Sequence, residues 1–134
     1  MMRIVVDTNV LVSAILFGGR PAELIRMILL HVVAAVATQE IIEEYQSTID
    51  YLLRKYDGRE VNIPLDIICS AMEIIPAQSR GKVCRDPDDD KFISCAMDGR
   101  CYYIVSGDKD LLTLKRYRGV RIVTVSEFFE LLGV

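Results

Sequence analysis

The stretch MRIVVDTN, at residues 2–9, decides the fold of this 134-residue chain. Its apolar run, residues 3–6, is rich in β-branched side chains and predicts a short buried strand. Asp7 follows directly, at the point where such a strand should give way to a turn. The carboxyl ends of strands in an open α/β sheet are where ligands bind, so an acid there indicates a functional site. The alternative is that Asp7 only caps a following helix.

A second apolar strand near the other end of the chain closes in the same way. The sequence CYYIVSGDKD, residues 101–110, predicts a strand over 101–106 followed by a turn that contains Asp108. Two further acidic clusters stand at Glu43 with Glu44 and at residues 86–90. Carboxylates gathered at one edge of a sheet repel one another unless a cation lies among them. The four clusters therefore predict a divalent-metal site, with Asp110 set apart as the cap of a short helix.

Strands and helices are expected to alternate along the whole chain. The strands are predicted at residues 3–6, 31–38, 101–106 and 120–125. The helices are predicted at 21–30, 39–56 with Thr38 as cap, 65–75, 86–98, 110–114 and 127–132 with Ser126 as cap, and residues 77–85 are predicted to be a loop. This order favours a three-layer α/β/α sandwich with a central, mostly parallel sheet of four to five strands, in one domain over residues 1–134.

Composition limits where such a domain works. Hydrophobic residues make up 51% of the chain and the mean hydropathy is +0.28, which suits a compact core. The longest apolar stretches, residues 29–37 and 122–125, are far shorter than the ~20 residues of a membrane helix, and no signal peptide opens the chain. A cytoplasmic protein is expected. Its cysteines form no C-x-x-C pair and are predicted to be reduced and mostly buried: Cys69, Cys84, Cys95 and Cys101.

The charge balance argues against binding nucleic acid by phosphate neutralisation alone. The net charge is −3 and the isoelectric point is near 5.2. A nucleic-acid substrate would need bound cations and local basic patches to reverse this field. Basic residues do gather near the C-terminal end, at Lys109, Lys115, Arg116, Arg118 and Arg121, although an ordinary solvated face accounts for them equally well.

The helix predicted after Thr38 distinguishes between its acids. At about 100° per residue its apolar side chains share an arc of about 120°. Glu44 lies about 120° from the centre of that arc, Glu43 about 140° and Glu40 about 160°. Glu44 is thus the acid nearest the buried seam, where a carboxylate is better held for metal ligation. A solvated helix face is the alternative.

These residues resemble the PIN domain family. The segments VVDTNVLVSAIL (5–16), CRDPDDDKFISCAM (84–97) and YIVSGDKDLL (103–112) occur in the expected order, and the similarity covers residues 2–128. In particular, they resemble the small prokaryotic PIN proteins that serve as toxins of toxin-antitoxin pairs (VapC-like). The resemblance implies a Mg²⁺- or Mn²⁺-dependent endoribonuclease that hydrolyses single-stranded RNA.

The resemblance also assigns the acids residue by residue. It makes Asp7 the first ligand, Glu44 the second and Asp108 the fourth. For the third, the Asp-Pro-x-Asp pattern points to Asp89, whereas the spacing back from Asp108 fits Asp90, which is kept as a neighbouring or second-metal ligand. The remaining expected roles are orientation of the ligands by Thr8, Asn9 and Ser106 and phosphate contacts from Lys91 and Lys109. The lone His31 leaves no evident histidine base.

Two other classes of function are compatible with parts of the pattern. A non-catalytic PIN-like module would bind RNA or protein with its acids unused. A receiver-type phosphoacceptor domain also collects acids at strand ends, but it presents an acidic pair after its first strand, where Thr8 and Asn9 follow Asp7. A toxin would further need a cognate antitoxin as partner. Apolar helix surface at Ile25, Leu29, Ile67 and Met72 could support a homodimer or simply belong to the core.

Overall fold

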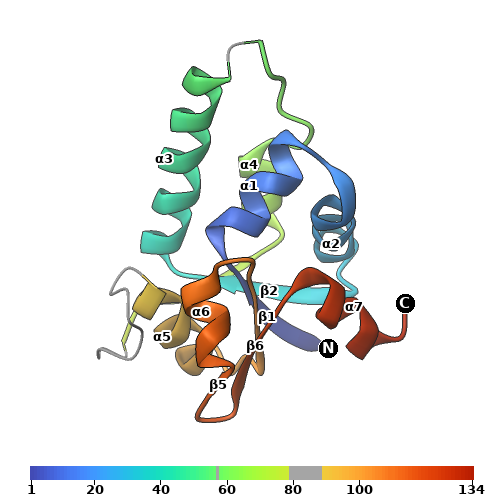
Figure 1. Cartoon of the computed structure of the whole chain (residues 1–134). Coiled ribbons are helices and arrows are strands. Elements are labelled where there is room, and N and C mark those ends of the chain that lie inside the picture. The colour runs from blue at the N-terminus through green and yellow to red at the C-terminus, as the bar shows by residue number, and fades with distance from the viewer. Residues whose placement is uncertain (57, 79–88) are drawn as a thin grey trace.

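The computed structural model describes residues 1–56, 58–78 and 89–134 and contains helices and strands in alternation (Figure 1). In chain order the strands are β1 (Met2–Val6), β2 (Val33–Ala37), β3 (Glu73–Ile74), β4 (Tyr103–Val105), β5 (Arg116–Tyr117) and β6 (Val120–Val123). The helices are α1 (Thr8–Leu16), α2 (Gly19–Leu29), α3 (Gln39–Lys55), α4 (Leu65–Ser70), α5 (Asp90–Asp98), α6 (Lys109–Leu114) and α7 (Val125–Leu132).

Strand β1 lies in the middle of the sheet. Among the described residues the sheet has six strands in the order β3-β2-β1-β4-β6-β5, all parallel except β5, which pairs antiparallel with β6. From β1 the chain moves to β2 on one side, whereas from β4 it moves to β6 on the other side. The boundary between β1 and β4 is therefore the topological switch point, which is the place where open α/β sheets bind ligands.

Helices cover both faces of this sheet. Figure 1 shows α1, α2, α3 and α4 on one side of the strands and α5 and α6 on the other. Crossovers between parallel strands are nearly always right-handed, so the direction of each crossover decides which face its helix covers. The three-layer α/β/α sandwich with a mostly parallel sheet is confirmed. The sheet is larger than the four to five strands predicted, because it includes the two-residue strands β3 and β5.

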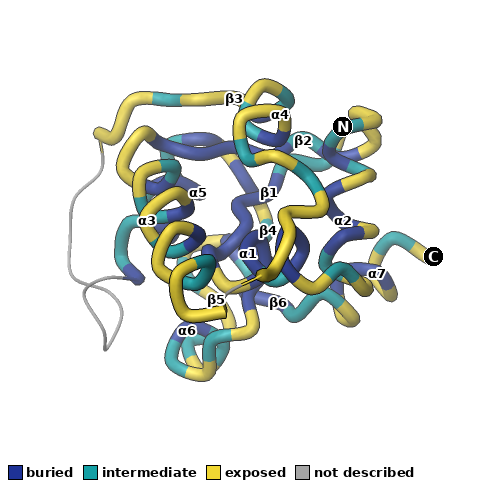
Figure 2. Tube along the Cα trace, turned by 90° about the horizontal axis from the view of Figure 1, so that it is seen from above, coloured by how far each residue is buried: buried dark blue, intermediate teal, exposed yellow. Residues whose placement is uncertain are grey.

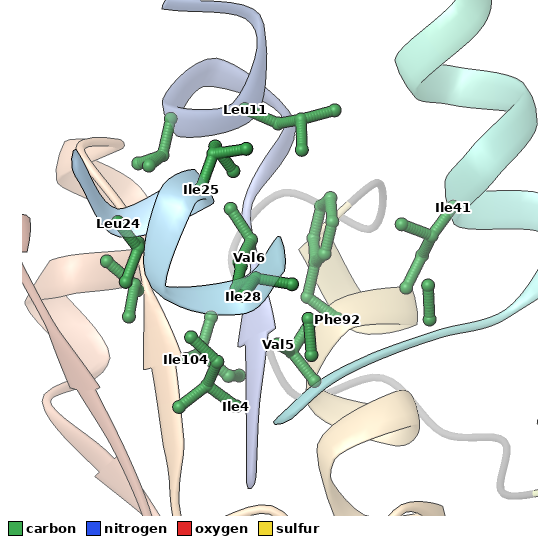
Figure 3. Close-up of a cluster of buried hydrophobic side chains, with 14 of the residues drawn as sticks. Ile4, Val5, Val6, Leu11, Leu24, Ile25, Ile28, Ile41, Phe92 and Ile104 are labelled. Carbon is green, nitrogen blue, oxygen red and sulfur yellow. The ribbon is translucent and has the colours of Figure 1, made fainter. Parts of the chain in front are cut away.

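The core explains why β1 reads as an unbroken apolar run. Ile4, Val5 and Val6 are each at most 1% exposed, because helices lie on both faces of the central strand. Figure 3 shows that these side chains pack against Ile25 and Ile28 of α2 on one face of the sheet and against Phe92 of α5 on the other. In Figure 2 the central strands are dark blue and the outer turns of the helices are yellow, so burial decreases outward from β1 and β4.

The helix prediction over residues 65–75 was wrong in its second half. The helix expected over residues 65–75 ends at Ser70, and Glu73–Ile74 instead forms edge strand β3 beside β2. The backbone N–H of Ile75 then donates to the Ala37 carbonyl at 2.9 Å. Pro76 disfavours helix at the residue before it, and the exposed edge of β2 offers hydrogen bonds to an extended chain. Residues 79–85 of the predicted loop lie outside the described residues.

The helix caps were predicted with mixed success. Thr38 caps α3 as expected, accepting from Ile41 N–H at 3.3 Å. Thr124, rather than Ser126, caps α7, because Thr124 and Glu127 form a reciprocal capping box. Asp108, rather than Asp110, caps α6: its carboxylate accepts from the backbone N–H of Asp110 at 2.8 Å. The choice of cap matters because Asp108 is one of the predicted metal ligands.

Other expectations concern burial. Cys95 and Cys101 are buried free thiols and Cys69 is a partly buried one, as predicted, while Cys84 lies outside the described residues. Of the four residues predicted as apolar helix surface, Ile25 and Met72 belong to the core, Leu29 is partly buried and Ile67 is 49% exposed. Within the described ranges no helix is both long enough and apolar enough to cross a membrane.

Tyr45 links α3 to the carboxyl end of β1 by a buried hydrogen bond. Its ring is fully buried and its hydroxyl donates to the Val6 carbonyl at 2.5 Å. We expect Tyr45→Phe to lower the free energy of unfolding by about 1–2 kcal/mol, because a buried hydrogen bond is lost without loss of ring packing. Urea unfolding measures this effect, with Tyr51→Phe, on the exposed face of the same helix, as the matched control. Equal stability of the two variants would contradict the anchoring role.

Candidate active site

Asp7 stands at the switch point, held between β1 and β4. It directly follows β1, and its backbone N–H donates to the Val105 carbonyl of β4 at 2.9 Å. The residue is 4% exposed, and its carboxylate accepts from the hydroxyl of Ser106, which is 1% exposed, at 2.6 Å. Asp7 also occupies the N-cap position of α1, but its side chain makes no capping hydrogen bond there. Helix capping alone therefore does not explain this acid.

The pKa of Asp7 is affected by its burial and by neighbouring acids. Burial raises the pKa of the Asp7 carboxyl above its ordinary value of 3.8, and hydrogen bonds from the Ser106 hydroxyl and the Thr8 backbone oppose that rise. The charges of Asp108 and Glu44 raise the same pKa further. Three of the predicted ligands thus share one electrostatic field, although they come from positions far apart in the sequence.

Asp108 is linked to Asp7 through Ser106. The backbone N–H of Asp108 donates to the Ser106 hydroxyl oxygen at 3.0 Å, while that hydroxyl donates to Asp7. One serine thereby sets the turn after β4 and orients the first acid. The sequence predicted Ser106 as an orienting residue, and these two bonds give it the means to act as one.

Glu44 is brought to the site by the first turns of α3. Its side chain is 30% exposed, whereas Glu43 and Glu40 are both exposed residues. The hydroxyl of the buried Thr8 donates to Glu44 Oε2, which ties the start of α1 to α3. The other carboxylate oxygen, Oε1, lies 2.5 Å from Lys91 Nζ. Lys91 is thus an ion-pair partner of Glu44, a contact that nothing in the linear sequence indicated.

The third acid comes from the start of α5. Asp89 is the N-cap residue of this helix and is 6% exposed, while Asp90 is the first helical residue and is partly buried. Asp89 therefore lies deeper than Asp90. The other acids of that cluster, Asp86 and Asp88, lie outside the described residues.

The remaining predicted residues lie at the surface. Asn9 and Lys109 are both exposed, Asn9 in the first turn of α1 and Lys109 at the start of α6. The orienting hydrogen bond to Asp7 that is seen comes from Ser106 instead. His31 is exposed in the turn before β2, at the edge of the sheet opposite Asp7. The site's chemistry accordingly rests on carboxylates and hydroxyls.

This donor set suits a hard divalent cation. Carboxylate oxygens are the ligands that Mg²⁺ and Mn²⁺ prefer, and mutual repulsion among Asp7, Glu44 and Asp108 would be relieved by such an ion. Within residues 1–56, 58–78 and 89–134, however, no three acidic, histidine or cysteine side chains are gathered closely enough to surround a cation as they stand. In the described residues, Asp7, Glu44 and Asp108 therefore interact electrostatically without surrounding a single point.

Comparison with known proteins identifies the family. A family model of the PIN domain matches residues 3–110, most of the chain and all four acidic positions. The chain belongs to the PIN domain family. PIN domains are a family of nucleases that generally depend on metal ions, in agreement with the carboxylate edge of this sheet. This PIN domain is also 34% identical over 118 residues to the uncharacterized protein MJ1680 of Methanocaldococcus jannaschii, a match covering 85% of this chain and 76% of that protein.

Ser106→Ala tests the orienting role within this PIN domain. We expect a roughly 10–100-fold loss of nuclease activity with little change in fold, because both Asp7 and the turn at Asp108 lose a hydrogen bond. Removing the hydroxyl also raises the pKa of Asp7 further, since that bond favours the charged form. Rate measurements over a range of pH should show that the variant needs more Mn²⁺ than the wild type, most of all at low pH. Unchanged kinetics, equal to those of an exposed control, Ser126→Ala, would exclude the role.

Proposed function

We propose that this PIN domain is a Mg²⁺- or Mn²⁺-dependent endoribonuclease that hydrolyses single-stranded RNA. The observation that carries the proposal is the shared field of Asp7, Glu44 and Asp108 at the switch point of the sheet. A carboxyl whose pKa is raised by burial, and further by neighbouring acids, is unfavourable for stability alone, which favours a functional reason for keeping these residues together.

The acidic residues share one proposed task. Asp7, Glu44 and Asp108 would hold the cation, together with Asp89 as the third acid in chain order and Asp90 as its neighbour. The chemistry that such an ion supplies is that of a Lewis acid, which makes a water more acidic and stabilises charge on the leaving oxygen of a phosphodiester.

The surrounding side chains would position these carboxylates. Ser106 orients Asp7 by its 2.6 Å hydrogen bond, and Thr8 orients Glu44 through its hydroxyl. Asn9 is proposed to assist at the rim of the site. Lys109 is exposed beside Asp108 and is proposed to contact a substrate phosphate, which would offset part of the acidic field.

A cleavage assay tests the enzymatic part. We expect a labelled single-stranded RNA to be cut in the presence of Mn²⁺ and to remain intact in excess EDTA, because the proposed chemistry needs the ion to make a water more acidic and to stabilise the leaving oxygen. A duplex RNA and a single-stranded DNA of the same sequence serve as controls for substrate class. Full activity in EDTA would refute the proposal, and RNA binding without cleavage at any metal concentration would favour the non-catalytic module.

The biological role that we propose is that of a toxin in a toxin-antitoxin pair. The support is the resemblance of the motif segments to the small prokaryotic toxins. Induced expression of the wild-type chain should stop growth, whereas expression of Asp7→Asn should not. A neighbouring small gene for a DNA-binding protein, when co-expressed, should restore growth. Normal growth under strong induction of an active nuclease would argue against the toxin role and leave the enzymatic proposal standing.

A further inference from the structure

The ion pair between Lys91 and Glu44 places a positive charge inside the proposed metal site. Lys91 Nζ lies 2.5 Å from Glu44 Oε1, and the lysine side chain is only 14% exposed. Its ammonium also lies 5.5 Å from the centroid of the buried Phe92 ring. A lysine that contacts a substrate phosphate would have its ammonium exposed and unpaired, whereas the Lys91 side chain is mostly buried and its ammonium is ion-paired.

Both oxygens of the Glu44 carboxylate are engaged in this arrangement. Thr8 donates to Oε2 and Lys91 pairs with Oε1. The pair also joins two elements, because Glu44 belongs to α3 and Lys91 to the first turn of α5, directly after Asp89 and Asp90. Lys91, which pairs with Glu44, therefore lies on α5, the same helix that has the third predicted acid, Asp89, at its N-cap.

A divalent cation and this ammonium compete for the same carboxylate. Two positive charges a few ångströms apart at one oxygen repel each other. The energy of this repulsion is at least as large as the attraction energy of a surface ion pair. Entry of the cation at Glu44 thus requires the lysine to withdraw from Oε1.

We propose that Lys91 is a displaceable counter-ion of Glu44, a positioning residue that the incoming metal ion must release. Before metal binds, Lys91 keeps the Glu44 carboxylate oriented and offsets part of its charge. Because the ion must displace Lys91, a higher metal concentration is needed to fill the site. This inference rests on the proposed function, since it assumes that Glu44 is a metal ligand. It assigns Lys91 to the carboxylate rather than to a substrate phosphate.

The test is Mn²⁺ binding to the metal-free protein, measured by titration calorimetry. Lys91→Met keeps the aliphatic stem and removes the charge, and we expect it to bind Mn²⁺ roughly tenfold more tightly than the wild type. Lys55→Met, at the exposed end of α3, is the matched control and should leave the affinity unchanged. In a Glu44→Gln background, Lys91→Met should have no further effect, because the pair is already broken.

A second measurement needs no substitution at Lys91. In the wild-type protein, acetylation of Lys91 by a water-soluble reagent, followed by mass spectrometry, should become faster when Mn²⁺ is added, while Lys55 should react at the same rate. Equal or weaker Mn²⁺ binding by a folded Lys91→Met, or unchanged Lys91 reactivity, would overturn the inference. If the wild type binds Mn²⁺ and cuts RNA in those cases, the proposed function stands; if it binds no Mn²⁺ at all, both fail.

Discussion

Asp7→Asn is expected to abolish Mn²⁺-dependent cleavage of single-stranded RNA, with a loss of roughly a thousandfold or more, because several kcal/mol of charge stabilisation depend on the metal that Asp7 would hold. The amide has nearly the shape of the carboxylate and its oxygen can still accept from Ser106. The variant should therefore fold normally while losing a charged metal ligand.

The metal-free stability of the same variant should change in the opposite direction. Burial, with the charges of Asp108 and Glu44, raises the pKa of Asp7 in the folded state. The folded protein then holds a proton that the unfolded chain has lost, so wild-type stability falls as the pH rises from the ordinary value of 3.8 through the raised pKa. The amide of the Asp7→Asn variant does not titrate. In EDTA the variant should thus be more stable than the wild type at neutral pH, and the difference should vanish at pH values below the ordinary pKa.

Metal should reverse this order. A ligand present at 100 times its dissociation constant stabilises the folded state by about 2.7 kcal/mol, which the wild type gains and Asp7→Asn does not. Thermal unfolding with EDTA and with Mn²⁺ should therefore show the two melting curves exchanging places. Asp50→Asn, at an exposed position of α3 outside the proposed site, makes the same chemical change and is the control that should retain the metal response. An Asp7→Asn variant that Mn²⁺ stabilises as strongly as the wild type would refute the assignment of Asp7 as a ligand.

Phe92→Ala is expected to cost about 3–5 kcal/mol of the free energy of unfolding, the largest stability effect that we predict. Its ring is 1% exposed and belongs to the same buried cluster as Val5, Val6 and Ile41, so truncation leaves a cavity between α5 and the sheet (Figure 3). For a domain whose total stability is of the order of 5–15 kcal/mol, this is a large fraction. The melting temperature should fall by roughly 10–20 °C.

The same variant should also lose activity below its melting temperature. Asp89, Asp90 and Lys91 immediately precede Phe92, so loosening α5 disturbs the third acid and the pair with Glu44. Phe92→Leu, which fills most of the space, should show a much smaller loss of stability, and Tyr102→Ala, at a side chain 70% exposed, should change it by no more than about 0.5 kcal/mol. A loss for Phe92→Ala as small as that of Tyr102→Ala would contradict its place in the core.

The acids that follow strands were predictable from local patterns. An apolar run followed by an acid gave Asp7 and Asp108 without reference to any partner, and helical periodicity ranked Glu44 above Glu43 and Glu40. The contacts of Glu44 with Thr8 and Lys91 agree with that ranking. The positions of these acids, as distinct from their proposed role as metal ligands, could be predicted because side-chain direction in a strand or helix is a property of the element itself.

Local patterns failed where two neighbouring residues offer the same chemistry. Asp108 and Asp110 are both acids near the start of α6, and Thr124 and Ser126 are both hydroxyl residues near the start of α7. The sequence favoured the later residue in each pair, and the structure uses the earlier one. Caps depend on where the preceding strand leaves the sheet, and hydrophobic patterns place element ends with an error of about 2–4 residues.

The sequence by itself determined the alternation of strands and helices, the apolar centre of the sheet and the acids at its strand ends, because these follow from short-range periodicity. Only the tertiary structure decided which side chain each acid meets. The bond from Ser106 to Asp7 spans 99 residues, and that from Thr8 to Glu44 spans 36. Lys91 could reach Glu44 only once α3 and α5 had packed together. Such contacts are set by the order in which strands pair and by the handedness of their crossovers, which no local pattern encodes.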